Sequence, residues 1–243
     1  MKLTYQGKNF DVMTYRSIRR AIGYLAISLP IILLTFSYFK FFNTKPQPSI
    51  SDYYYTNLRE IFTGTLCAVG LFLIRYEGHR NASIWKNDKL LTNIAGIMAI
   101  GVALVPTTAP KPDLSTNGEK PCEIIIYTLI HYPLNWLHYT FAAVLFLILA
   151  LIALNVFTIK NENDIPAYEY SIYRFCGYSI LLFIILIPLN LFNNATLVFE
   201  ALSLFSFGTA WLIKGRALGD KGNWGRKLYG EENNQNTEKI FEE

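Results

Sequence analysis

Two long stretches without Asp, Glu, Lys or Arg, residues 124–159 and 175–199, constrain this chain more than any other feature. As a helix, the first would measure about 54 Å at 1.5 Å per residue, whereas the hydrocarbon core of a bilayer is about 30 Å thick. It is too long for one crossing, and Pro133 interrupts it. Uncharged blocks of this kind are typical of membrane-spanning helices, because helices of soluble domains carry apolar residues at amphipathic spacing.

The division of the chain at its charged and turn-forming segments predicts an all-α, polytopic membrane protein with six transmembrane helices and both termini in the cytoplasm. Residues 1–20 would be a cytoplasmic N-terminal segment, residues 21–214 the six-helix domain and residues 215–243 a cytoplasmic tail. The expected spans cover about residues 21–42, 58–76, 90–108, 134–158, 174–191 and 195–213. Asn193 and Asn194 are expected to form the turn between the fifth and sixth spans. Residues 124–132 are expected to form an interfacial or re-entrant segment before the fourth span.

The distribution of Lys and Arg sets the orientation. Of the 22 basic residues, 17 lie in the terminal segments and in the loops after the second and fourth spans, and five lie on the other side. This excess predicts cytoplasmic termini and a multi-pass protein of the bacterial inner (plasma) membrane. The basic residues are scattered between apolar spans instead of gathered on one soluble face, so the net charge of +4 does not indicate nucleic-acid binding.

The second expected span has charged residues close to both of its ends. Only the uncharged residues 61–74 separate Arg59 and Glu60 from Arg75, and as a helix they measure about 21 Å. A helix that crosses the bilayer would have to extend by about three residues at each end, which draws Arg59 and Glu60 to the edge of the lipid. Charge at that depth usually faces a partner or a wet cavity.

The same helix arithmetic places His138 about one turn into the fourth span and Glu200 about one turn into the sixth, at a similar depth. We therefore expect an outward-facing polar pocket between spans two, four and six. The expected ligand-binding residues are Arg59, Glu60, His138, Glu200, Asp52, Tyr54, Tyr55 and Thr107. No residue is firmly assigned to catalysis, for which the candidates are His138, Glu60 and Glu200.

Several functions remain open for this pocket. Binding of a small amphiphile or lipid headgroup, in a sensor or assembly role, is the leading hypothesis, because Arg and carboxylates in a semi-dry pocket can hold such a group. The alternative is an outer-leaflet hydrolase or transferase acting on a lipid-linked substrate, with His138 as base and Glu60 or Glu200 as its partner. A small transporter ranks third. The cluster could also serve only to tie helices together, with Arg59 paired to Glu200.

The sequence contains no HExxH, GxSxG, P-loop or dinucleotide fingerprint. No metal site and no cofactor is therefore expected, and an enzyme is the less favoured class. The expected partners are the lipid bilayer and a lipid or amphiphile ligand, with no nucleic acid. The oligomeric state, a homo-oligomer included, stays open.

Small residues at four-residue spacing predict one helix contact. Ala95, Ala99 and Ala103 line one face of the third span, and Gly64 and Ala68 give the second span a matching face. Because small residues let helix backbones approach closely in membranes, the second and third spans are expected to pack together.

Short motifs spread over most of the chain resemble those of uncharacterised bacterial six-helix membrane proteins. These motifs are Tyr54-Tyr55-Thr56 with Arg59-Glu60 and Phe62, Gly101-Val102-Ala103 with Pro106-Thr107, His138 opening a helix, Glu200, Phe207-Gly208 and Trp211-Leu212-Ile213-Lys214-Gly215. The layout is also similar, more distantly and in architecture alone, to the DRAM and FRAG-like six-helix membrane proteins. Those pair a Ser-rich segment before span two with a His that opens span four. The resemblance implies a six-helix fold and no particular reaction.

Overall fold

The computed structural model describes residues 2–78, 81–107, 135–159 and 167–219, together with residues 225, 228 and 229. Within these ranges the chain is helical, without strands. The α-helices are α1 (Lys2–Ser37), α2 (Arg59–Arg75), α3 (Asp88–Leu104), α4 (Asn135–Leu151), α5 (Ala167–Leu186) and α6 (Ala195–Lys214). The expected prelude at residues 124–132 and most of the tail at 215–243 lie outside the described residues.

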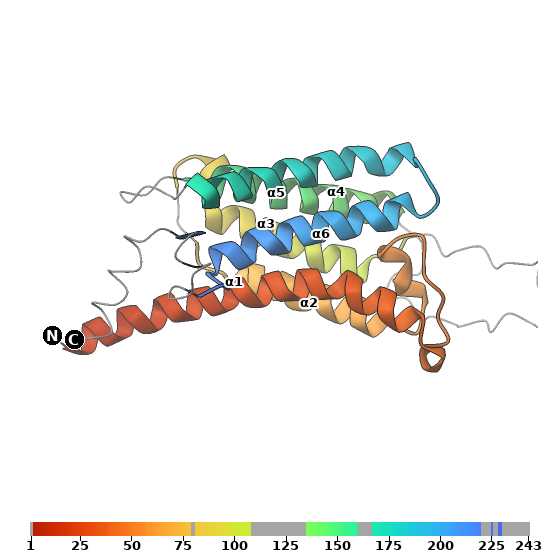
Figure 1. Ribbon diagram of the computed structural model, residues 1–243, viewed down its shortest axis with the longest axis horizontal. Helices are drawn as coiled ribbons and strands as arrows, with labels where there is room; N and C mark the ends of the chain where they lie inside the picture. The colour runs from red at the N-terminus through yellow and green to blue at the C-terminus, as the bar shows by residue number, and fades with distance from the viewer. Residues whose placement is uncertain are drawn as a thin grey trace, which may run out of the picture.

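The α-helices pack side by side in chain order, each against the next, and α6 packs against α1. They therefore form a closed ring, elongated along the helix axes (Figure 1). Two ends can be distinguished. The Ser51 end holds the connection from α1 to α2, residues 105–107 after α3 and the turn from α5 to α6, whereas the Lys214 end holds the end of α6 and Arg19 of α1. There the Arg19 Nη1 donates to the Lys214 carbonyl over 3.4 Å.

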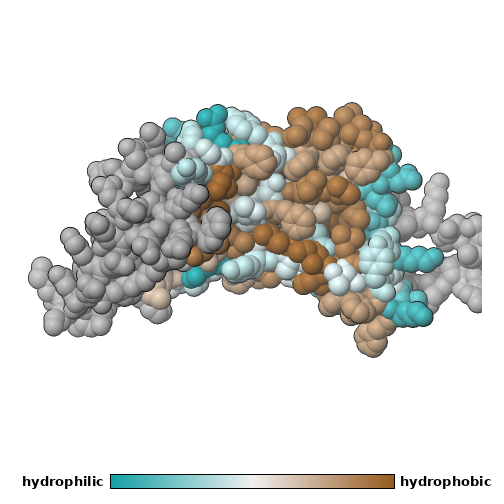
Figure 2. Space-filling view, in the orientation of Figure 1, coloured by the Kyte–Doolittle hydropathy of each residue, from teal (hydrophilic) through white to brown (hydrophobic). Residues whose placement is uncertain are grey.

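Four of the helices are long and apolar enough to cross a membrane. They cover Met13–Ser37, Asn135–Val156, Tyr168–Leu189 and Ala195–Lys214. Figure 2 shows apolar residues over much of the visible face and hydrophilic residues toward its two ends. Apolar side chains such as Ile31, Leu71 and Ile185 are exposed. A surface of this kind is expected where helices face lipid, and together with the four long apolar helices it is compatible with a helical membrane protein.

Two helices begin earlier than predicted. α1 begins at Lys2 instead of near residue 21, so the N-terminal segment continues the first helix, and residues 2–29 contain no Pro that would interrupt it. α5 begins at Ala167, seven residues before the expected 174. α2, Arg59–Arg75, agrees with the expected 58–76 to within one residue at each end. The predicted turn before α6 is confirmed, with Asn190 and Asn194 in the left-handed conformation at φ 44° and 63°.

The predicted contact between the second and third helices is confirmed, but the small residues of α2 that make it differ from the expected ones. On α3, Ala95, Ala99 and Ala103 are buried as expected. On α2, Gly64 is exposed, and a Cβ there would meet nothing within 4 Å. The close approach lies at Gly70, where a Cβ would come within 2.8 Å of the Gly96 carbonyl oxygen.

A similar glycine pair closes the ring. A Cβ at Gly23 of α1 would lie 2.9 Å from the Gly208 carbonyl oxygen of α6, and a Cβ at Gly208 would lie 2.8 Å from the Gly23 carbonyl oxygen. Neither distance is tolerated between a side chain and a backbone oxygen, so both positions need Gly. α1 and α6 therefore meet backbone to backbone.

Aromatic side chains surround the basic groups at the Lys214 end. The Lys214 ammonium lies 5.5 Å from the Phe157 ring centre and 5.4 Å from the Tyr173 ring centre. Arg19 donates to the Tyr76 hydroxyl over 2.6 Å. Cation–π contacts and charge-assisted hydrogen bonds of this kind stabilise cations that leave water. Lys214 is thus held among aromatic rings at this end of the ring of helices.

Candidate functional site

The connection from α1 to α2 folds back against the helix ends. It contains two 3₁₀ helices, η1 (Lys40–Phe42) and η2 (Ser51–Tyr55). The Ser49 hydroxyl accepts a hydrogen bond from the Asp52 N–H over 3.1 Å and so starts η2, and the Thr56 hydroxyl donates to the Tyr53 carbonyl over 2.8 Å and ends it. Tyr53 and Tyr54 of η2 are buried. This segment therefore supplies protein surface where α2 is too short to do so.

His138 joins η2 to two of the long helices. It lies in the first turn of α4 and is 2% exposed. Its Nδ1 lies 2.6 Å from the Val105 carbonyl oxygen, just after α3, and its Nε2 lies 3.0 Å from the Ser51 Oγ. A carbonyl can only accept, so Nδ1 carries the proton. In the neutral ring Nε2 is then an acceptor, and the Ser51 hydroxyl donates to it.

Glu200 holds the residue next to Ser51. Its carboxylate accepts a hydrogen bond from the Ile50 N–H over 2.7 Å. One turn earlier on α6, the Leu197 N–H donates to the Pro48 carbonyl over 3.0 Å. The start of η2 is thus fastened to α6 by Glu200 and to α4 by His138.

Asp52, Tyr55 and Thr107 form a second group of contacts beside this pair. The Thr107 hydroxyl lies 3.4 Å from the Asp52 Oδ1, and the Tyr55 hydroxyl donates to the Thr107 carbonyl. Burial raises the pKa of Tyr55, and the nearby Tyr54 and Asp52 raise it further. The Tyr55 hydroxyl therefore stays protonated and keeps its donor role at neutral pH.

Arg59 does not meet Glu200, contrary to the pairing considered from the sequence. Its Nη2 donates to the Tyr54 hydroxyl over 2.8 Å, and its guanidinium carbon lies 4.3 Å from the centre of the Tyr54 ring. Glu60 is exposed and makes no hydrogen bond or ion pair with any described residue. Because α2 begins at Arg59, both side chains sit at the helix end, and Glu60 stays outside the polar cluster.

The predicted residues therefore separate into three parts. Asp52, Tyr55, Thr107, His138 and Glu200 are brought together around η2, Arg59 and Tyr54 form a neighbouring pair, and Glu60 stands apart. Neither Glu60 nor Glu200 is the hydrogen-bond partner of His138, which instead contacts Ser51 and Val105. The described residues contain no group of three His, Cys, Asp or Glu side chains able to hold a metal ion.

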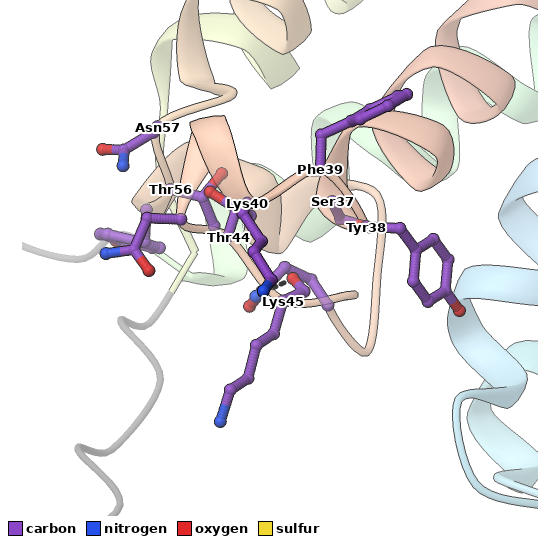
Figure 3. Close-up of a pocket in the computed structure, with 11 residues that line it drawn as sticks. Ser37, Tyr38, Phe39, Lys40, Thr44, Lys45, Thr56 and Asn57 are labelled. Atoms are coloured by element: carbon purple, nitrogen blue, oxygen red, sulfur yellow. Dashed lines mark hydrogen bonds between the residues drawn. The ribbon is translucent and has the colours of Figure 1, made fainter.

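A groove of about 600 Å³ opens at the Ser51 end, between the end of α1, η1 and the residues that lead into α2 (Figure 3). Its lining is polar and aromatic and includes two basic side chains. The lining residues are Ser37, Tyr38, Phe39, Lys40, Asn43, Thr44, Lys45, Gln47, Tyr55, Thr56 and Asn57. Sequence reasoning expected only a short loop here. The signal that could have revealed the groove is the pair of lysines on the side where basic residues are few.

Tyr55 connects this groove to the polar cluster. Its ring lines the groove, and its hydroxyl donates to the carbonyl of Thr107, whose own hydroxyl lies near Asp52. The two features thus share one residue and one end of the ring, and they can act on the same bound molecule.

Comparisons of this chain with protein-family models, with curated proteins and with solved structures find no match. The function is therefore argued from the geometry of the Ser51 end.

Proposed function

We propose that the protein is a six-span membrane protein that binds an anionic amphiphile, such as a phospholipid, by its headgroup in the groove at the Ser51 end. The observation that supports this proposal is the groove itself. It places Lys40 and Lys45 beside hydroxyl and amide side chains and beside the exposed aromatic residues Tyr38 and Phe39. An amphiphile needs this combination of a charged site and an adjoining apolar surface.

The charge of the lining favours an anion. Lys40 and Lys45 are the charged residues of the groove, and no Asp or Glu is among the residues that line it. An ammonium group near a phosphate contributes about 1 kcal/mol at a membrane surface. Hydroxyl and amide groups, such as those of Thr44, Thr56 and Asn57, can donate further hydrogen bonds to phosphate or glycerol oxygens.

The proposed topology has all six α-helices crossing a bacterial inner membrane, with the Lys214 end in the cytoplasm and the groove facing outward. α2 and α3 have 17 residues each, which is about 25 Å and thus somewhat short of a 30 Å core. At the Ser51 end η2 folds in ahead of α2 and makes up part of the missing length. The excess of Lys and Arg at the Lys214 end supports this orientation.

Titration of the purified protein with short-chain phosphatidylglycerol, followed by native mass spectrometry, tests the binding site. Replacement of both groove lysines, Lys40→Ala with Lys45→Ala, is expected to weaken binding by about 2 kcal/mol, which is roughly thirtyfold. The matched control, Lys86→Ala with Lys89→Ala at the other end, removes the same charge and should leave the affinity unchanged.

Two results would contradict the proposal. Equal binding by the groove double variant and the wild type would place the lipid elsewhere. Equally tight binding of soluble glycerol phosphate would make the ligand a free phosphate compound instead of an amphiphile.

A further inference from the structure

The contact between Ser51 and His138 has the geometry of a nucleophile and its general base. The Oγ to Nε2 distance is 3.0 Å, within the reach of about 2.6–3.2 Å that proton transfer requires. The other ring nitrogen is held by the Val105 carbonyl at 2.6 Å. An activated serine needs both features, a base within reach and a third group that orients the base.

The orientation of the ring settles which way the proton can move. Because Nδ1 donates to a carbonyl, the free lone pair of the neutral ring lies on Nε2 and points at the Ser51 hydroxyl. His138 can thus take the hydroxyl proton, whereas the opposite tautomer could not. Burial of the ring opposes formation of the imidazolium, and the hydrogen bond to Val105 and the charge of the nearby Asp52 carboxylate offset part of that cost.

Ser51 is also accessible to a limited extent. It is 8% exposed, the largest exposed fraction among the buried polar side chains of the described residues. It begins η2, and Tyr55 at the end of the same short helix lines the groove. The nucleophile therefore lies less than two turns from the place where a headgroup would bind.

We propose that Ser51 is a catalytic nucleophile with His138 as its general base, and that the protein hydrolyses a carboxylic ester of a membrane-borne amphiphile. The choice of an amphiphile as substrate rests on the proposed headgroup site, whereas the reactivity of Ser51 does not. Neither residue needs a metal or a cofactor for this role.

The reaction takes two steps. The Ser51 Oγ attacks the ester carbonyl carbon while Nε2 takes the hydroxyl proton, the bond from that carbon to the alcohol oxygen breaks, and the leaving alcohol receives the proton from Nε2. Water then attacks the acyl carbon with Nε2 again as base, and the bond to Oγ breaks and Oγ regains a proton. The sum is ester plus water giving acid plus alcohol.

An uncharged alkyl fluorophosphonate tests the reactivity of Ser51 directly. The probe is incubated with the purified protein in detergent, and the adduct is located by peptide mass spectrometry. Serines that lack a base do not react appreciably with such a probe, so an adduct on Ser51 is expected in the wild type. Ser51→Ala should abolish it, and His138→Gln should slow it by about a hundredfold, the scale of general-base catalysis.

The controls separate catalysis from a purely structural role. Ser28→Ala removes a hydroxyl that donates within α1, to the Leu25 carbonyl over 3.1 Å, and should leave labelling of Ser51 intact. The double variant Lys40→Ala with Lys45→Ala should also label normally with this uncharged probe, so loss of headgroup binding and loss of reactivity are distinguished.

Two outcomes would overturn the assignment: no adduct on Ser51 in folded wild-type protein, or an adduct that forms equally fast in folded His138→Gln. The wild-type measurement stands by itself, because it decides the question even if a variant fails to fold.

Discussion

Arg59 and Glu60 are adjacent in sequence and differ completely in surroundings. The Arg59 guanidinium lies over the Tyr54 ring and donates to its hydroxyl, whereas Glu60 is exposed. Successive residues of a helix point about 100° apart, so only one of them can face η2. Each of these two charged residues was expected to face a partner at this depth. Of the two, only Arg59 has one among the described residues.

Alanine substitution at these two positions should therefore have unequal effects. Arg59→Ala removes a cation–π contact worth about 0.5–2 kcal/mol and a hydrogen bond, so the thermal midpoint should fall by several degrees at about 2–4 °C per kcal/mol. Glu60→Ala should change it by less than about 1 °C. Thermal unfolding of both variants in one detergent measures the difference, and equal losses would contradict this account of the pair.

The candidate site could be located from the sequence at the residue scale, but its contacts could not. Charge and spacing singled out His138 and Glu200 as candidates at a similar depth, because ionisable groups in uncharged helices are rare. The partner of His138 could not be identified, since Ser51 reaches it only after η2 folds back across the helix ends. The partner of Glu200 could not be identified either, because the Ile50 N–H that donates a hydrogen bond to it lies in the same folded-back segment.

At the scale of elements, the segment before α2 explains most of what the sequence left unpredicted. The expected span, residues 58–76, agrees with α2 to within one residue at each end. The chain before it turns at Thr56, and the 3₁₀ helix η2 packs Tyr53 and Tyr54 into the ring. Helix positions follow from local composition, whereas such a turn depends on hydrogen bonds to α4 and α6 that lie far along the chain.

Two glycines of α2 provide a matched test of helix packing. Gly70→Ala would place a Cβ 2.7 Å from Ile100 and 2.8 Å from the Gly96 carbonyl oxygen, so α2 and α3 must separate, at a cost of about 1–3 kcal/mol. Gly64→Ala meets nothing within 4 Å and should be neutral or stabilise α2 by up to about 1 kcal/mol. Thermal midpoints in detergent measure both, and a stable Gly70→Ala variant would refute the close approach.

At the scale of the whole molecule, the ring has two chemically different ends. The Ser51 end carries the groove and the carboxylates Asp52 and Glu200, and the Lys214 end carries Arg19 and Lys214 among aromatic rings. The orientation was predicted from the Lys and Arg residues alone. Arg19, in the middle of α1, lies beside Lys214 at the end of α6, so α1 and α6 meet at the same end of the ring.

Single cysteines at the two ends test this topology. In a background in which the three native cysteines are replaced, Lys45→Cys should react with a membrane-impermeant maleimide on intact cells. Lys86→Cys, in the 3₁₀ helix η3 (Ile84–Lys86) between α2 and α3, should react only after the cells are permeabilised. Reaction of both in intact cells would show that α2 does not cross the membrane.

The closure of the ring by α1 and α6 bears on how the protein is made. Helices leave the ribosome in chain order, so α1 waits in the membrane, with its Gly23 face uncovered, until α6 has been synthesised. Glu200 arrives with α6, and η2 gains its second anchor only then. A nascent chain that stops before α6 would therefore lack the finished Ser51 end, which is complete only when α6 has packed against α1.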